Sequence, residues 1–442
     1  MKLKINALIA IMLLFAAALQ AGNNPRFEFT EFTLENGLHV ILNEDNTTPN
    51  IVVNIMYHVG AKNETPDRTG FAHFFEHLMF EGSKHIGRGE FSEIVEMAGG
   101  SLNAYTSFDV TNYFVLLPSN QLELGLWLES ERLLHPVIDS IGIATQKSVV
   151  TEEMKQSRDN RPYGRLLTET IKRAFKEHPY RSDVLGKDEH IRNATEEDIK
   201  AFHDMFYVPN NAVLVITGDI DIDQTKLLVE KYFGDIPSGR LEPRRPTVIE
   251  PPLPHEIRDT VFDNIQLPAV IQAYRIPASG TDDYYAVEML GSLLSSGQSS
   301  RLHRRLVNQE RKAMQISAIP LGLEDPGISL IFALPNMGID PNDMEKLIDE
   351  ELERVRTGLI SEDELQKLKN QYESRFVNGN TTIARRAMNL ANFYTYHKDP
   401  DLINTQLEKY HAVTREDIRA AAKNYFNEDN RVVLYYMPQP TN

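Results

Sequence analysis

The chain has 442 residues, with 46 lysine and arginine residues against 63 aspartate and glutamate residues, so its formal net charge is −17. Hydrophobic residues make up 41% of the chain, which is enough for more than one packed core at this length. The acidic balance argues against a nucleic-acid-binding surface, since phosphate contacts need clustered lysine and arginine. The absence of cysteine excludes disulfides, thiol catalysis and cysteine-based zinc sites, so a transition metal would need histidine and carboxylate ligands.

Residues 1–21 have the layout of a secretory signal peptide. Two lysines precede an apolar run over residues 7–19, and a small residue, Ala21, stands at the expected cleavage point. The run is shorter than the ~20 apolar residues that a membrane-spanning helix needs, so we expect cleavage rather than an uncleaved anchor. The sequence therefore predicts an exported, soluble protein whose mature chain begins near Gly22. The periplasm of a Gram-negative bacterium is the expected location, with secretion beyond the cell as the alternative.

The mature chain divides into two halves of similar size. Residues 237–258 contain six prolines and no hydrophobic periodicity, which is typical of an extended, semi-rigid linker. The flanking halves repeat at an offset of 219 residues: Thr195 and Thr414 each begin a Thr-x-Glu-Asp helix start, followed by a helical pattern and an apolar run suited to a strand. We therefore predict an N-terminal domain over residues 22–236 and a C-terminal repeat domain over residues 259–442.

The expected elements are a mixture of helices and strands. In chain order, the sequence predicts strands over residues 37–44 and 51–60, a strand pair over 101–117, helices over 119–135 and 145–158, a strand over 212–218 and a helix over 344–356. The first two strands are expected to be adjacent, and the absence of crossover helices between paired strands favours antiparallel hairpins over a doubly wound sheet. The predicted fold class is α+β, with two repeated domains, each an antiparallel-rich sheet with helices on one face.

The strongest chemical signal lies in the segment GFAHFFEHLMFEGS, residues 70–83. It contains the pattern His-x-x-Glu-His, formed by His73, Glu76 and His77, within a segment of helical composition. Residues four apart share one face of a helix, so both imidazoles can point at one ion while Glu76 lies beside it. A solvated helix face that happens to carry two histidines is the alternative. The apolar neighbours of the motif argue against this alternative because they indicate a packed helix.

A third ligand is expected elsewhere, because a catalytic zinc ion normally has three protein ligands and an open position. The helical segment 145–158 offers the adjacent residues Glu152 and Glu153. Here the sequence resembles the inverted zinc metallopeptidases of the pitrilysin and mitochondrial processing peptidase type. Their motif is His-x-x-Glu-His, followed after about 75 residues by a glutamate ligand. The resemblance places this ligand at Glu153 and leaves Glu152 as a surface carboxylate.

The resemblance extends over nearly the whole mature chain. Residues 99–114 are similar to the glycine-asparagine strand with which the family holds substrate. Residues 178–186, 206–221 and 295–302 are similar to further segments of the family. Family members contain repeated α+β domains around a cavity, so the resemblance implies that this chain forms half of a clamshell-like peptidase.

The resemblance also implies a role for each site residue. One zinc ion per chain would be held by three ligands, His73, His77 and Glu153. Glu76 would act as the general base on zinc-bound water, and Asn103 and Ala104 would lie on an edge strand that binds an extended peptide by β-augmentation. The alternative for Asn103 is that it is an ordinary turn residue without a role in substrate binding. Where the family usually has a glutamate that supports the metal ligands, this chain has Gln146, an amide without charge, so this support is expected to be weaker.

The second half lacks both the metal motif and a substrate-binding pair. The positions aligned with the motif are occupied by Val287, Leu290 and Gly291. Active family members place an Arg and, seven residues later, a Tyr against the substrate carbonyl. The corresponding residues here are Val307 and Met314, which cannot donate a side-chain hydrogen bond. We therefore expect a heterodimer in which a second family subunit supplies the Arg and Tyr; the alternative is that Arg301 or Arg305 has taken over this role.

The expected function is a zinc-dependent endopeptidase subunit that acts on extended peptides or small unfolded polypeptides. Two other functions fit parts of the sequence. A non-catalytic structural or peptide-binding member of the same family would keep the fold, although such proteins generally lose motif residues that are intact here. A metal-storing protein would bind zinc without hydrolysis. Neither nucleic acid nor, after signal cleavage, a membrane is expected among the partners.

Overall fold

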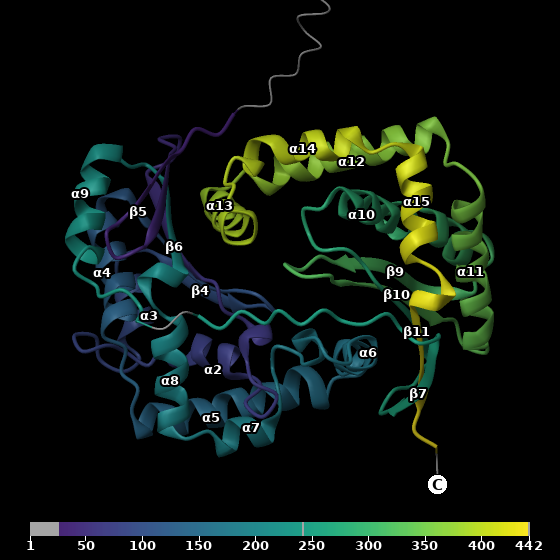
Figure 1. Ribbon diagram of the computed structural model, residues 1–442, viewed down its shortest axis with the longest axis horizontal. Helices are drawn as coiled ribbons and strands as arrows, with labels where there is room; N and C mark the ends of the chain where they lie inside the picture. The colour runs from purple at the N-terminus through teal and green to yellow at the C-terminus, as the bar shows by residue number, and fades with distance from the viewer. Residues whose placement is uncertain (1–25, 241–242, 441–442) are drawn as a thin grey trace, which may run out of the picture.

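The computed structural model describes residues 26–240 and 243–440. The predicted signal peptide, residues 1–21, lies outside this part of the chain. Figure 1 shows two sheets at opposite ends of the molecule, each accompanied by helices. Within the described ranges, no helix is long and apolar enough to cross a membrane.

The first sheet has six strands in the order β1-β2-β6-β3-β5-β4. They are β1 (Thr30–Thr33), β2 (His39–Glu44), β3 (Asn50–Tyr57), β4 (Ser101–Thr106), β5 (Thr111–Pro118) and β6 (Ala212–Gly218). β6 pairs in parallel with β2 and antiparallel with β3, so it lies between them. The expectation that β2 and β3 are adjacent is therefore wrong. All seven residues of β6 are buried, which explains why this apolar strand takes a central place.

The second sheet has five strands in the order β7-β11-β8-β10-β9. They are β7 (Ile257–Asp263), β8 (Ala269–Arg275), β9 (Ala313–Leu321), β10 (Ile328–Pro335) and β11 (Arg431–Pro438). β11 pairs in parallel with β7 and antiparallel with β8, just as β6 does with β2 and β3. With β1 set aside, both sheets have the same strand order and directions. The predicted α+β class with two repeated, antiparallel-rich domains is confirmed.

Both halves contain helices, and one pair of these helices begins in the same way. The first half contains α2 (Phe71–Leu78), α3 (Glu90–Met97), α4 (Leu122–Leu134), α5 (Ser140–Met154), α6 (Leu166–Ala174), α7 (Asp188–Asn193), α8 (Glu196–Phe206) and α9 (Ile222–Phe233). The second contains α10 (Asp282–Ser295), α11 (Pro341–Thr357), α12 (Glu362–Gly379), α13 (Ile383–His397), α14 (Leu402–Ala412) and α15 (Arg415–Tyr425). α8 and α15 begin with matching capping boxes, in which Thr195 pairs with Asp198 and Thr414 with Asp417.

Each sheet has one face covered by a helix from the opposite half. Ala387 and Leu390 of α13 pack against Val213 of β6 in the first sheet, and Figure 1 shows α13 beside this strand. In return, Ile171 of α6 belongs to the same apolar cluster as Leu434 of β11 in the second sheet. Because their two faces are both covered, the central strands read as continuous apolar runs. These reciprocal contacts of α13 and α6 join the two halves.

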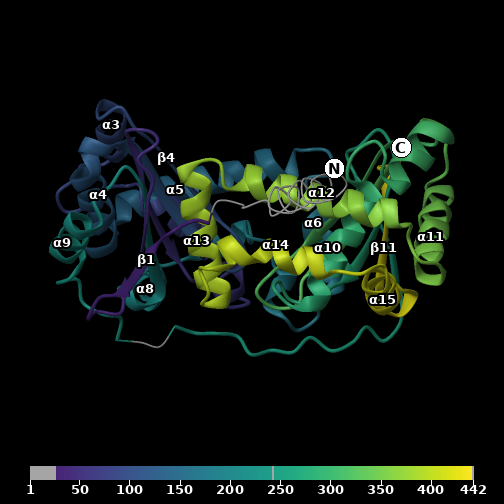
Figure 2. The same cartoon turned by 90° about the horizontal axis from the view of Figure 1, so that it is seen from above.

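The proline-rich segment runs along one edge of the molecule (Figure 2), and β7 follows it in the chain. The described residues of 237–256 form neither helix nor strand, as the composition predicts. Asn63 Nδ2 donates to the backbone oxygen of Arg244 at 2.9 Å. The carboxylate of Glu250 accepts the backbone N–H groups of residues 176–178 at 2.7–2.9 Å. The segment is therefore anchored at Arg244 and Glu250, while the domain boundaries expected on either side of it stay a prediction.

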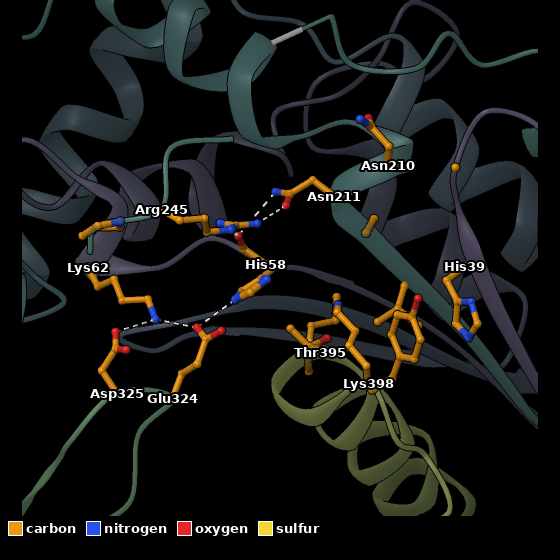
Figure 3. Close-up of a pocket in the computed structure, with 16 residues that line it drawn as sticks. His39, His58, Lys62, Asn210, Asn211, Arg245, Glu324, Asp325, Thr395 and Lys398 are labelled. Carbon is orange, nitrogen blue, oxygen red and sulfur yellow. Dashed lines mark hydrogen bonds and ion pairs between the residues drawn. The ribbon is translucent and has the colours of Figure 1, made fainter. Parts of the chain in front are cut away.

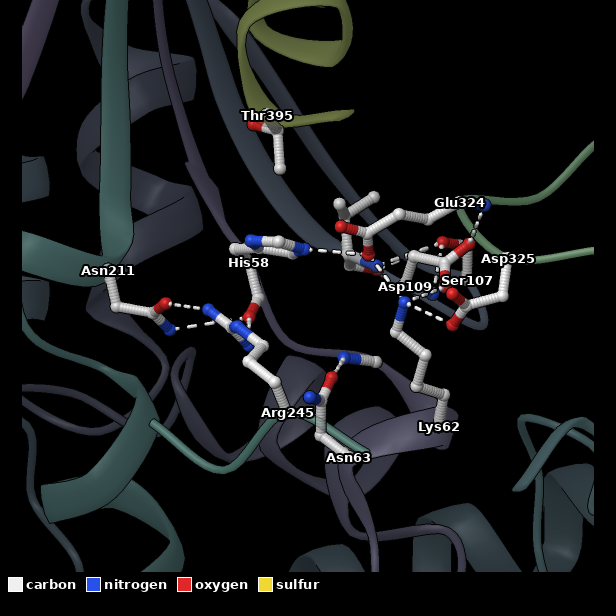
Figure 4. Close-up of polar contacts among 12 residues, drawn as sticks. His58, Lys62, Asn63, Ser107, Asp109, Asn211, Arg245, Glu324, Asp325 and Thr395 are labelled. Carbon is white, nitrogen blue, oxygen red and sulfur yellow. Dashed lines mark hydrogen bonds and ion pairs between the residues drawn. The ribbon is translucent and has the colours of Figure 1, made fainter. Parts of the chain in front are cut away.

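A buried charge network joins the two halves (Figure 4). Lys62 Nζ lies 3.0 Å from Asp109 Oδ1 and 3.1 Å from Asp325 Oδ2, and it also pairs with Glu324. His58 Nε2 lies 2.8 Å from Glu324 Oε2. The side chain of Lys62 is 4% exposed and that of Asp109 is fully buried. Because Asp109 lies in the loop between β4 and β5, the network fixes this hairpin relative to the second half.

A cavity of about 490 Å³ lies beside this network (Figure 3). Its walls come from both halves and include His39, His58, Glu324 and Lys398. The residues of the His-x-x-Glu-His motif do not line it. The cavity is therefore a feature of the seam between the halves rather than of the predicted metal site.

Candidate metal centre

The motif lies on α2, whose start is set by two features of the preceding loop. Gly70 has φ 88°, and a Cβ at this position would lie 2.5 Å from the backbone oxygen of Leu185, so only glycine fits. The carboxylate of Glu64 accepts the backbone N–H groups of Gly70 and Ala72, both at 2.8 Å, and so satisfies donors that a helix start leaves free. Burial raises the pKa of Glu64 to about 8, although these two N–H groups act to lower it.

The structure brings the three predicted ligands together. His73 Nε2 and His77 Nε2 lie 3.3 Å apart. Glu153 Oε2, from the last turn of α5, lies 3.1 Å from His77 Nε2 and 3.6 Å from His73 Nε2. Ligand atoms of a tetrahedral zinc ion, each ~2.0–2.1 Å from the metal, are roughly 3.3 Å from one another. Two imidazole nitrogens and one carboxylate oxygen at these separations fit a zinc ion and leave a fourth position open.

The protonation states of the cluster suit a metal. Burial, and then the charge of His77, lowers the pKa of His73 to about 4, so its imidazole is neutral at pH 7. The hydrogen bond from His77 lowers the pKa of Glu153, which is therefore ionised. A neutral imidazole and an ionised carboxylate are the forms that bind a metal ion.

Glu76 lies beside the cluster and is held by the edge strand. Thr106 Oγ1, from the last residue of β4, donates to Glu76 Oε2 at 2.7 Å. Burial raises the pKa of Glu76, while the bond from Thr106 acts to lower it. A carboxylate with a raised pKa is better suited to accept a proton from water. Sequence reasoning missed the roles of Thr106 and Glu64; the only signal for Thr106 was its place in segment 99–114.

Asn103 and Ala104 lie on β4, at the edge of the first sheet. Among the described strands, β4 pairs with β5 alone, so its outer edge stays open. Asn103 is exposed, and its Oδ1 accepts the backbone N–H of Ala104 at 2.9 Å. The strand ends at Thr106, so this open edge leads directly to Glu76.

Gln146 is on α5 with Glu153, but its hydrogen bond leads away from the cluster. Its Nε2 donates to Glu81, a buried carboxylate that also pairs with Arg88, and not to any of the three clustered ligands. The neighbouring Glu152 is exposed, and its Oε2 lies 3.2 Å from Lys155 Nζ. The structure therefore brings Glu153, but neither Gln146 nor Glu152, into contact with the histidines.

Within its described residues, the second half has no counterpart of this centre. The residues aligned with the motif are buried in the core on α10: Val287, Leu290 and Gly291. Val307 packs against the same core, and Met314, on the edge strand β9, is 56% exposed. Arg301 makes two hydrogen bonds of 2.8 Å to Glu364, and Arg305 pairs with carboxylates of the same half. Both arginines that could replace the missing donor are thus engaged within the second half.

The fold and the His-x-x-Glu-His cluster define the class of inverted zinc metallopeptidases. The family described as Insulinase (Peptidase family M16) matches residues 39–188, and the description Peptidase M16 inactive domain matches residues 193–372. The zinc protease PqqE of Helicobacter pylori is 30% identical over 409 residues, which cover 92% of each chain. The chain belongs to the M16 family of peptidases.

Two solved structures extend the comparison. A protease from Helicobacter pylori has a TM-score of 0.89 at 29% identity, over 93% of this chain and 100% of that chain. The periplasmic protease PqqL of Escherichia coli has a TM-score of 0.77 at 18% identity, over 93% of this chain but 48% of that chain. At this identity the likeness to PqqL concerns the fold alone, and this chain matches about half of that protein.

Proposed function

We propose that the chain is the zinc-binding subunit of an endopeptidase that cleaves extended peptides or small unfolded polypeptides. The observation that carries the proposal is the meeting of His73, His77 and Glu153 at separations suited to one zinc ion, with Glu76 alongside. The relatives named as zinc proteases support it.

The chain's own residues supply most of the proposed chemistry. When bound at this cluster, zinc supplies Lewis acidity that activates water toward a peptide carbonyl. Glu76 takes the proton from this water and passes it to the leaving amine, a role worth typically ~10²- to 10⁴-fold in rate. Thr106 orients Glu76 through Oε2. The open edge of β4, at Asn103 and Ala104, offers main-chain groups to an extended substrate without strict sequence choice.

We further propose that a partner completes the site. Val307 and Met314 offer no side-chain donor to a developing oxyanion, and Arg301 and Arg305 are paired with carboxylates of their own half. The partner would be a second family chain that carries the Arg and Tyr. The length of PqqL, about twice that of the part matching this chain, supports an assembly of two such halves.

Export to the periplasm is also part of the proposal. It rests on the charge and hydropathy pattern of residues 1–21, and PqqL, which has a similar fold, is a periplasmic protease. Sequencing the amino terminus of the protein recovered from the periplasmic fraction should find a start near Gly22, and a start at Met1 would contradict signal cleavage.

The test is a cleavage assay on unstructured peptides with the zinc-loaded chain, alone and with a family chain that carries the Arg and Tyr. We expect little cleavage by the chain alone, because loss of one oxyanion donor typically costs ~10²- to 10³-fold in rate. Addition of the partner should restore activity. Glu76→Gln should keep zinc and abolish cleavage, while the exposed control Glu152→Gln should match the unmodified chain.

Three results would contradict parts of the proposal. Cleavage by Glu76→Gln near the unmodified rate would remove Glu76 from its role. Robust cleavage by the chain alone, at a rate that the partner does not raise, would remove the need for a heterodimer. Zinc binding without cleavage in any combination would favour the non-catalytic, peptide-binding member of the family.

A further inference from the structure

A second cluster of potential metal ligands lies outside the candidate metal centre. In the part of the chain that the structure describes, two groups of three His, Asp or Glu residues bring one ligand atom each within 4.8 Å of one another. One is the centre described above; the other consists of His85, Glu131 and His135. We propose that this second group is a structural site for a divalent transition-metal ion such as Zn²⁺, separate from the site of hydrolysis.

The geometry of the group suits one ion. His85 Nδ1 lies 2.9 Å from Glu131 Oε1, and His135 Nδ1 lies 3.4 Å from the same oxygen. The centres of the two imidazole rings are 5.6 Å apart, with the rings nearly perpendicular at 88°. Neighbouring ligand atoms around tetrahedral zinc are roughly 3.3 Å apart, so these three atoms can share one ion with small adjustments.

The local fold holds Glu131 in place for this role. Glu131 and His135 are one helical turn apart at the end of α4, while His85 comes from the segment between α2 and α3. Ser83 Oγ donates to Glu131 Oε2 at 2.7 Å, which leaves Oε1 facing the histidines. The backbone N–H of Lys84 donates to the oxygen of His135 at 3.0 Å and fixes the two segments together. Such hydrogen bonds to a ligating carboxylate orient it for a metal.

The exposure of the three side chains permits an ion to enter. The side chain of Glu131 is 9% exposed, whereas those of His85 and His135 are 51% and 31% exposed. The cluster therefore combines a fixed anionic ligand with two imidazoles that solvent can reach.

The donor set selects the class of ion. Two imidazole nitrogens and one carboxylate oxygen suit zinc and its neighbours among the transition metals, whereas Ca²⁺ and Mg²⁺ require mostly oxygen ligands. A bound ion would join α4 to the segment that directly follows α2. Its expected effect is to stabilise the part of the fold that carries the candidate metal centre, and it takes no part in the reaction.

The experiment measures zinc in a variant that lacks the first site, His73→Ala/His77→Ala. After equilibrium dialysis against Zn²⁺, this variant should retain about one equivalent, and the unmodified chain about two. Adding His85→Ala/His135→Ala should remove the remaining zinc. The control adds His255→Ala/His411→Ala instead, two exposed histidines outside both clusters, and should leave the zinc content unchanged.

Two further measurements keep the test independent of folding defects. The single change His85→Ala, at a half-exposed side chain, should also weaken zinc binding by the background variant, and circular dichroism checks that each variant is folded. Zinc should raise the thermal midpoint of the background variant but not that of the variant lacking both clusters. The proposal is overturned if the background variant binds no zinc, or if its zinc content is the same with and without His85 and His135.

Discussion

Thr106 is the residue that connects the edge strand β4 to the proposed base. Its hydroxyl donates to Glu76 Oε2 at 2.7 Å. Thr106→Val should keep zinc but lower kcat roughly 10- to 100-fold, because a hydrogen bond to a charged group contributes about 1.5–3 kcal/mol. Steady-state kinetics of the assembled enzyme would measure the effect, with Thr106→Ser as the control that keeps the hydroxyl. An unchanged kcat in Thr106→Val would show that Glu76 is oriented by other groups.

Glu64 acts on the candidate metal centre indirectly, by holding the start of α2, the helix that carries the motif. Its two carboxylate oxygens accept the N–H groups of Gly70 and Ala72. Above about pH 8, where Glu64 is ionised, Glu64→Gln replaces one acceptor with a donor that faces a backbone N–H, so the free energy of unfolding should fall by about 1–3 kcal/mol. Urea denaturation of the zinc-free chain would measure this loss. The exposed change Glu152→Gln should cause almost none, and equal stability of the two variants would contradict the role of Glu64.

At the scale of elements, α6 and α13 each pack against the sheet of the opposite half and so join the two halves. Leu390 of α13 is fully buried against the first sheet. Leu390→Ala should therefore lower the free energy of unfolding by about 2–5 kcal/mol through lost burial and a residual cavity. Leu227 on α9 is 74% exposed, and Leu227→Ala should change stability by less than about 0.5 kcal/mol. If denaturant titrations gave both variants the same stability, α13 would not be part of the folding core.

At the scale of the whole molecule, the charge network at Lys62 is expected to stabilise the contact between the two halves. Lys62→Met would leave the fully buried Asp109 without its cation. Breaking a buried pair in this way costs about 3–5 kcal/mol, so the variant should unfold at clearly lower denaturant concentration. The side chain of Lys226 is 40% exposed, with its Nζ 3.8 Å from Asp223 Oδ1, and the control Lys226→Met should cost at most about 1 kcal/mol. Equal midpoints for the two variants would be inconsistent with a seam held by this network.

The same network should make stability depend on acid. Burial acts to raise the pKa of Glu324, but bonds and charges from His58 and Lys62 lower it from 4.5 to about 2. A carboxyl group whose folded-state pKa is depressed contributes stability above its unfolded pKa, and this stability is lost as pH falls toward the folded value. The free energy of unfolding should therefore decrease between about pH 5 and pH 2, and less steeply in Glu324→Gln. Identical slopes would exclude Glu324 as a source of the acid sensitivity.

Much of the fold was predictable because its signals are local or repeated. The paired Thr-x-Glu-Asp helix starts indicated two copies of one domain, and both copies have the same strand order. The placement of His73 and His77 on one helical face follows from their spacing of four. Glu153 is different: its place 76 residues after His77 came from the family resemblance, because no local pattern relates two separate helices.

The sequence by itself determined several of the helices and strands, the repeat and the pair of histidines, since each depends on residues within a few turns or on a direct comparison of the two halves. Only the tertiary structure decided that β6 lies between β2 and β3, and that Thr106 meets Glu76. It likewise decided that Lys62 contacts carboxylates of both halves and that His85 meets Glu131. These contacts join residues distant in the chain, whose partners are chosen by the packing of whole sheets and helices and leave no periodic trace in the sequence.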